Sequence, residues 1–191
     1  MNRRRFLSAA ASGGAVLVGS GTLAPAVAAA TEDELAYANF GAATELLLQN
    51  FYGRVGEEKL FSGQLAKAFA RGRFAAGEHA AALAALLTGA GQTAPLEEDF
   101  DFAWPEGTFA NKRSAATAGS TIAEALLGTY LTAAATSPTD SFRVLHASLV
   151  ASLGEQLSTL SLARSRPAIG NSFPAALDLE AANAAVESFL G

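Results

Sequence analysis

Four glutamates are the residues best placed to do chemistry, because each lies in the interior of a long Ala/Leu-rich segment. They are Glu45, Glu78, Glu124 and Glu155, and the members of successive pairs are 33 and 31 residues apart. If each pair of segments forms a helical hairpin, such similar separations place both members of a pair at similar heights. Four converging carboxylates would repel one another unless they were protonated or bound a cation, and oxygen ligands suit iron or manganese.

The two histidines of the sequence, His79 and His146, each fall on a leucine-lined face of their segment. A histidine on such a face is more often a packed, hydrogen-bonded core residue than a metal ligand, so we treat both as weaker metal candidates. Together with one or two of the glutamates they could form a mononuclear site. The geometry of the folded chain has to decide between these alternatives.

The segments that carry these residues have the length and composition of helices in a helical bundle. They span about 33–53, 62–89, 112–135 and 139–164, lack internal proline and repeat apolar residues every three or four positions. The short first and third connections favour antiparallel neighbours, whereas 90–111 is long enough to cross the bundle. Its aromatic residues are expected to seal one side of the bundle. Asp178 is a suitable N-cap for a short closing helix within 178–190.

Several short motifs follow one another in a characteristic order. They are Glu45-Leu-Leu-Leu-Gln-Asn-Phe51-Tyr52, Asp101-Phe102, Glu124-Ala-Leu-Leu-Gly-Thr-Tyr130, Gly154-Glu155, Phe173-Pro174, Leu177-Asp178 and Phe189-Leu190-Gly191. In these motifs the chain resembles the ferritin-like superfamily, in particular its secreted, desiccation-related branch. The resemblance covers most of the chain after residue 30. We therefore expect an all-α, ferritin-like four-helix bundle with a long crossover between its second and third helices and a short C-terminal helix.

The resemblance also implies a ligand pattern, which this sequence keeps only in part. Family members with a di-metal site use one glutamate from each of the first and third helices, and a Glu-x-x-His pair from each of the other two. Here Ala81 and Ser158 stand three residues after Glu78 and Glu155. These two glutamates also fall on polar helix faces, whereas Glu45 lies against an apolar stripe. We therefore expect a degenerate metal site.

The N-terminus has the order of a twin-arginine signal peptide. Arg3-Arg4 is followed by Phe6-Leu7, then by a weakly apolar run rich in glycine, and then by small residues up to Ala30. An uncleaved membrane anchor is the less favoured alternative, because glycines and Pro25 interrupt a run already too short to span a bilayer. We predict a signal peptide at 1–30, one ferritin-like domain at 31–191, and export to the periplasm, cell envelope or exterior.

Composition narrows the classes of partner. The leader holds three arginines and no acidic residue, so the remaining chain carries a formal charge of −8, against −5 for the whole. A strongly acidic domain is a poor partner for nucleic acid, and no transmembrane span is expected after processing. The sequence contains no cysteine, so neither a disulfide nor a cysteine-linked lipid anchor can form. A homo-oligomer is compatible with the sequence, which points to no specific partner.

Two functions follow from these observations. The favoured one is a non-catalytic binding or structural protein of the cell exterior with a degenerate metal site and no resident cofactor; a role in envelope stress is implied by the family resemblance alone. The alternative is a di-iron or di-manganese oxidoreductase, either a ferroxidase or a peroxide-consuming enzyme. That enzyme would use Glu45, Glu78, Glu124 and Glu155 and bind about two metal ions per chain.

Overall fold

The chain is all-helical over the residues that the computed structural model describes, which are 30–170 and 174–190. Its α-helices are α2 (Glu32–Glu57), α3 (Gly63–Gly89), α4 (Lys112–Thr136), α5 (Asp140–Ala163) and α6 (Leu179–Val186), with two 3-10 turns, η1 (Glu97–Asp99) and η2 (Glu187–Phe189). The predicted all-α class is therefore confirmed. The predicted signal peptide at 1–30 lies outside the described residues, apart from Ala30.

Capping side chains set the start of several helices. Thr31 and Glu34 form a capping box at the start of α2, in which each side chain binds the backbone N–H of the other residue. The Asn111 side chain accepts from two backbone N–H groups in the first turn of α4. As predicted, Asp178 caps the C-terminal helix α6. At its other end, α2 continues four residues past the predicted limit at residue 53 and includes both Gly53 and Gly56.

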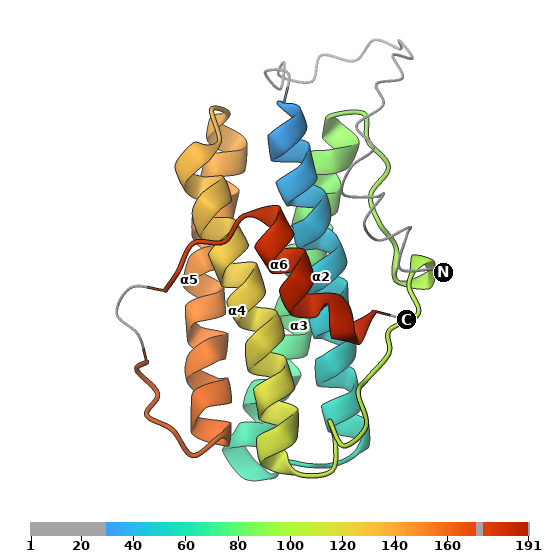
Figure 1. Cartoon of the computed structure of the whole chain (residues 1–191), viewed down its shortest axis with the longest axis vertical. Coiled ribbons are helices and arrows are strands. Elements are labelled where there is room, and N and C mark those ends of the chain that lie inside the picture. Colours follow the sequence, from blue (N-terminus) through green and yellow to red (C-terminus); the bar gives the residue numbers. More distant parts are fainter. Residues whose placement is uncertain (1–29, 171–173, 191) are drawn as a thin grey trace.

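The four long helices lie side by side (Figure 1). The closest packing joins α2 to α3 and α4 to α5, the two pairs that are consecutive in the sequence. Helix α2 also packs along α4, and α3 packs along α5 less closely. The largest fully buried side chains come from α2, α3, α4 and α5, and include Tyr130, Phe40, Phe51 and Phe142. A single core therefore fills the space among these helices.

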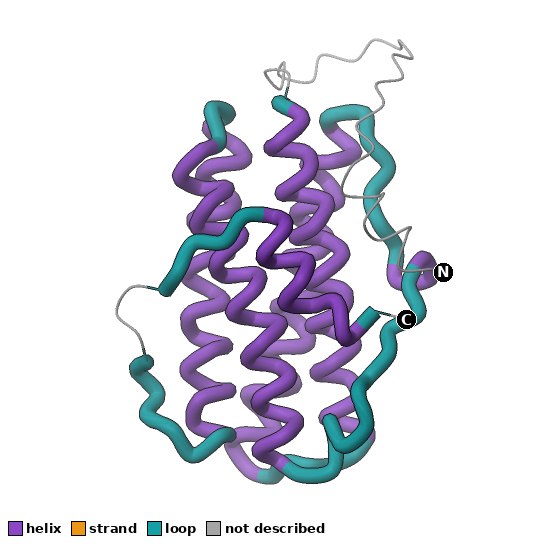
Figure 2. Tube along the Cα trace, in the orientation of Figure 1, coloured by secondary structure: helices purple, strands orange, loops and turns teal. Residues whose placement is uncertain are grey.

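The connection between α3 and α4 runs along the side of the helices from one end to the other (Figures 1 and 2). Its Trp104 ring lies 6.0 Å from the ring of Phe51 in the core and 5.5 Å from that of Phe189. Phe102 forms an isolated antiparallel bridge with Leu190. The aromatic residues of this segment thus pack against the core and the C-terminus, as expected from the sequence.

The C-terminal part of the chain lies across α4. The Leu177 N–H donates to the carbonyl of Gly128 at 3.0 Å, and α6 packs mainly on α4 (Figure 1). A Cβ atom on Gly128 would lie only 2.6 Å from Cγ of Leu177. The glycine therefore lets this segment approach the α4 backbone closely enough for the hydrogen bond.

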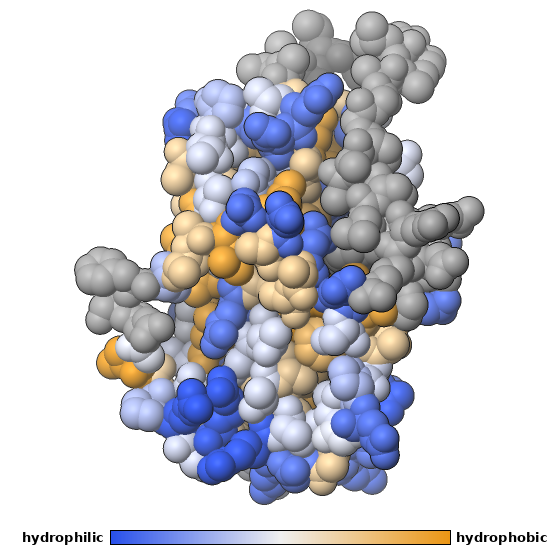
Figure 3. Space-filling model, in the orientation of Figure 1, coloured by the Kyte–Doolittle hydropathy of each residue, from blue (hydrophilic) through white to orange (hydrophobic). Residues whose placement is uncertain are grey.

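On the face shown in Figure 3, hydrophilic residues gather mainly at the two ends of the helices, and most of the hydrophobic colour lies between them. Within the described ranges, no helix is both long enough and apolar enough to cross a bilayer.

Candidate functional site

One glutamate lies at the centre of the helices and is held by two side chains from other helices. Glu45, in the middle of α2, is fully buried. Its Oε1 lies 3.0 Å from Nδ1 of His79 on α3 and accepts a hydrogen bond of 3.1 Å from the hydroxyl of Tyr130 on α4. When the carboxylate is ionised, Nδ1 of His79 carries the hydrogen. Three helices therefore converge on one carboxylate oxygen.

The residues around Glu45 explain why these partners can reach it. Gly41 lies one helical turn before Glu45, and a Cβ atom there would be 2.8 Å from Cε1 of Tyr130. The absence of a side chain at Gly41 thus makes room for the Tyr130 ring. The neighbouring Leu48 is fully buried, so the carboxylate lies in an apolar stripe, as the sequence predicted.

Burial dominates the electrostatics of this cluster. Desolvation raises the pKa of Glu45, and the hydrogen bond and charge of His79 and the hydrogen bond from Tyr130 offset only part of that effect. Desolvation, together with the nearby Glu45 charge, also raises the pKa of Tyr130 well above its ordinary value. The second carboxylate oxygen, Oε2, has no hydrogen-bond partner. Burial with one oxygen unpaired leaves the negative charge poorly stabilised, so the neutral carboxyl is favoured.

The other three predicted glutamates do not join Glu45. Glu78, Glu124 and Glu155 are all exposed to solvent. In the described part of the chain, no three carboxylate or imidazole side chains are grouped so that they could hold a metal ion. The cluster itself offers only Glu45 and His79, whose side chain is 13 % exposed. This donor set does not fit a di-metal centre, which needs four carboxylates and two histidines.

No family model and no curated protein matches this chain. The ferritin-like relationship therefore stays a prediction from the sequence motifs.

The second candidate histidine, His146, is buried in a different environment. It is fully buried on α5, with its ring centroid 5.5 Å from that of Tyr130, and neither ring nitrogen has a hydrogen bond of good geometry. Desolvation lowers the pKa of His146 to about 4, and weaker effects of the Phe142 backbone and the Glu34 charge oppose it. His146 is thus a neutral core residue at neutral pH. The expected packing is present, whereas the expected hydrogen bond is not.

A second polar pair crosses the interior beside the Glu45 cluster. The Tyr52 hydroxyl, on α2, donates to Oε1 of Gln156 on α5 at 2.9 Å, and both side chains are buried. The amide nitrogen of Gln156 has no partner. Desolvation and the charge of Glu45 raise the pKa of Tyr52 far above its ordinary value. This pair ties α2 to α5 beside the groove between α3 and α5, which both side chains line.

Sequence reasoning missed four residues that make buried polar contacts, namely Tyr130, Tyr52, Gln156 and Glu34. Tyr130 entered the sequence analysis only as the last residue of the motif Glu124–Tyr130, and nothing in its spacing identifies Glu45 as its partner. The Tyr52–Gln156 pair was likewise hidden, since its members are 104 residues apart. Glu34 was detectable, because Thr31-Glu32-Asp33-Glu34 has the Thr-x-x-Glu pattern of a capping box.

Proposed function

We propose that this chain is an exported, ferritin-like four-helix-bundle protein whose metal site is degenerate and whose role is binding or structural rather than oxidative. The leader with Arg3-Arg4 and Phe6-Leu7 supports export by the twin-arginine route. The order and packing of α2, α3, α4 and α5, with a long connection after the second of them, support the bundle with one crossover.

The observation that carries the proposal is the bonding of Glu45. In a di-metal bundle, the equivalent carboxylate would face other carboxylates across a shared ion. Here its Oε1 is bound by His79 and Tyr130, and the three other glutamates lie at the surface. Glu45 thus orients the His79 ring, which is partly accessible to solvent. Among the described residues, the cluster offers too few ligands for two ions.

The metal content of natively exported protein tests this proposal. The metal would be measured in purified protein, followed by thermal unfolding with added Fe²⁺ and Mn²⁺. We expect no bound transition metal and no stabilisation, because binding would have to break the contacts of Glu45 with His79 and Tyr130. The Glu45→Gln variant, with the exposed Glu78→Gln as its matched control, should show the same absence of a response.

Two results would overturn the proposal in different ways. About two equivalents of metal, lost in both Glu45→Ala and Glu155→Ala, would establish the oxidoreductase alternative. About one equivalent, lost in Glu45→Gln and His79→Gln but retained in Glu155→Gln, would establish a mononuclear site. Export is tested separately: replacing Arg3 and Arg4 by lysine should leave the protein in the cytoplasm, and unchanged export would refute the twin-arginine assignment.

A further inference from the structure

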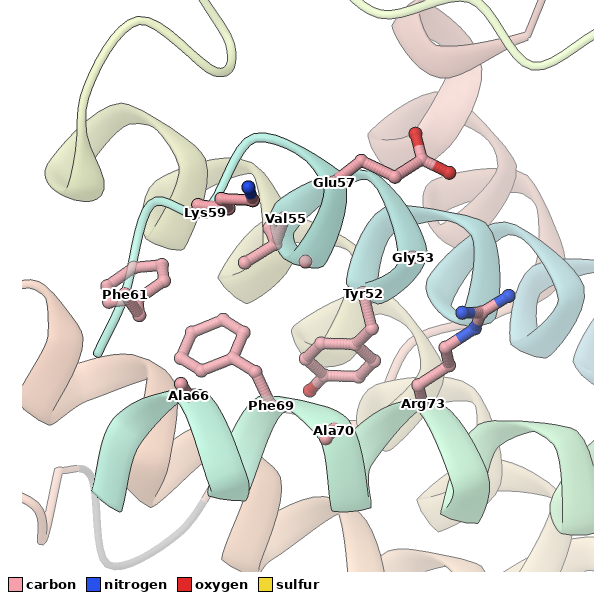
Figure 4. Close-up of a pocket in the computed structure, with 11 residues that line it drawn as sticks. Tyr52, Gly53, Val55, Glu57, Lys59, Phe61, Ala66, Phe69, Ala70 and Arg73 are labelled. Atoms are coloured by element: carbon pink, nitrogen blue, oxygen red, sulfur yellow. The ribbon is translucent and has the colours of Figure 1, made fainter. Parts of the chain in front are cut away.

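A cavity of about 440 Å³ lies between the end of α2, the turn that follows it and the start of α3 (Figure 4). Its volume falls within the range of about 300–1,000 Å³ typical of small-molecule sites. It is separate from the Glu45 cluster, and none of the predicted metal ligands lines it.

The cavity exists because small residues face one another across it. Gly53 and Gly56 lie one turn apart on α2, and Ala66 and Ala70 lie one turn apart on α3. A Cβ atom added to Gly56 would meet nothing within 4 Å. A Cβ atom on Gly53 would lie 3.5 Å from Cζ of Arg73, so the guanidinium covers Gly53 and the space is open beside Gly56.

Aromatic rings form the inner wall of the cavity. The rings of Phe61 and Phe69 are stacked with centroids 4.4 Å apart, and Tyr52 meets Phe69 edge-on at 5.6 Å. Figure 4 shows the three rings arranged along the cavity. Such a wall favours a ligand with an aromatic ring, since paired rings gain about 0.5–1.5 kcal/mol beyond the area that they bury.

Two cations lie at the rim of the cavity. Within the described ranges, neither Lys59 nor Arg73 forms an ion pair, and both are exposed. The one acidic residue of the lining, Glu57, is 3.7 Å from Arg54, and its carboxylate points away from the cavity in Figure 4. The cavity therefore presents positive charge that the rest of the described chain does not neutralise.

The turn after α2 fixes the position of Lys59. Lys59 adopts a left-handed backbone conformation with φ of 50°, and its N–H donates to the Gly56 carbonyl at 3.2 Å. The Leu60 N–H donates to the Val55 carbonyl at 3.4 Å, which completes a Schellman-type helix end. The side chain of Lys59 therefore leaves the turn at one end of the cavity, and that of Arg73 leaves α3 at the other (Figure 4).

We propose that this cavity binds a small aromatic carboxylate, with its ring against the wall of Phe61, Phe69 and Tyr52 and its carboxylate held by Arg73 at one end, while Lys59 adds positive potential from the other end. A guanidinium can bind a carboxylate through two parallel hydrogen bonds, and the lysine adds a second positive charge. The cations at the rim favour a ligand with a carboxylate, and the aromatic rings of the wall favour a ligand with an aromatic ring. The site does not depend on whether the Glu45 cluster binds metal.

Calorimetric titration of the purified protein with benzoate and with trans-cinnamate tests the proposal. Benzamide has the same ring without the charge, and cyclohexanecarboxylate has the charge without the aromatic ring. We expect both aromatic acids to bind, and each comparator to bind about tenfold more weakly or worse. Arg73→Gln should weaken benzoate binding about tenfold and Lys59→Gln should weaken it less, whereas Arg71→Gln, which removes an exposed cation of the same helix that does not line the cavity, should leave binding unchanged.

A cavity-filling variant gives an independent test. Gly56→Leu should abolish benzoate binding without loss of stability, because its side chain enters open space and leucine is the better helix former. Gly154→Leu on α5, where a Cβ atom also meets nothing within 4 Å, is the matched control and should bind normally. Absence of binding by both acids, equal binding of benzamide, or retained binding in Gly56→Leu would each overturn the proposal.

Discussion

Replacing His146 by leucine should flatten the pH dependence of stability. Burial lowers the pKa of His146 from its ordinary 6.5 to about 4, so between these values the unfolded chain binds more protons than the folded one. The free energy of unfolding must then rise with pH across that window and fall as the pH is lowered through it. With these two pKa values, protonation of His146 lowers the free energy of unfolding by about 2 kcal/mol between pH 7.5 and pH 5.0.

The His146→Leu variant lacks this titration. At pH 7.5 it should be at least as stable as the unmodified protein, because it removes two buried ring nitrogens that have no hydrogen-bond partners. At pH 5.0 its advantage should grow by the same ~2 kcal/mol. Urea unfolding of both proteins at the two pH values measures the difference directly, and the subtraction cancels groups that titrate equally in both proteins.

A core variant one turn along the same helix serves as the control. Leu149→Met is also buried and does not titrate, so its stability difference should be the same at both pH values. The reasoning would be refuted if the stability advantage of His146→Leu did not change with pH. A pKa above 6 for His146, measured by NMR titration of the folded protein, would refute the reasoning independently.

Three further changes have predictable outcomes. Gly119→Ala should destabilise the protein by roughly 1–2 kcal/mol in thermal unfolding despite its better helix propensity, because the new Cβ would lie 2.5 Å from Cε1 of Phe51; stability equal to the unmodified protein would contradict this. Glu34→Ala should cost roughly 2–4 kcal/mol at pH 7 in urea unfolding, since Glu34 accepts hydrogen bonds from Thr31 and from Thr139. Burial raises the pKa of Glu34, but these bonds outweigh it and lower the pKa overall. The stabilisation by Glu34 is therefore present above pH 4.5 and is lost as the pH falls through the pKa of Glu34 in the folded protein. If Glu34→Ala destabilised the protein as much at pH 3 as at pH 7, this prediction would be wrong. Glu45→Gln should become more stable relative to the unmodified protein as the pH rises above 4.5, because the variant has no buried carboxylate to ionise. The difference in the free energy of unfolding should grow by about 1.4 kcal/mol for each unit by which burial raises the pKa of Glu45. A difference that shrinks between pH 4.5 and pH 8 would refute this prediction.

Much of the secondary structure could be predicted because its signals are local. Asn111 and Asp178 mark helix starts through side chains that satisfy free backbone N–H groups, and those contacts span only two or three residues. The end of α2 was less predictable, since Gly53 and Gly56 are compatible with either a turn or a helix. Their role in opening a cavity depends on which residues of α3 face them.

The candidate site shows where helical spacing stops being informative. Separations of 33 and 31 residues were used to place the glutamates at similar heights, but height does not fix the direction in which a side chain points. Each residue of an α-helix is rotated by about 100° from the previous one, so neighbouring residues face different surroundings. His79 therefore reaches Glu45, while the adjacent Glu78 faces solvent.

The sequence by itself determined the helical class, most helix limits, the placement of Glu45 on an apolar stripe and the polar faces of Glu78 and Glu155. These properties depend on periodicity and composition, which are local to each segment. Only the tertiary structure decided that His79 and Tyr130 share one oxygen of Glu45 and that His146 is buried without a hydrogen bond. Such contacts depend on the rotation and axial position of each helix against its neighbours, which the packing of the whole core sets.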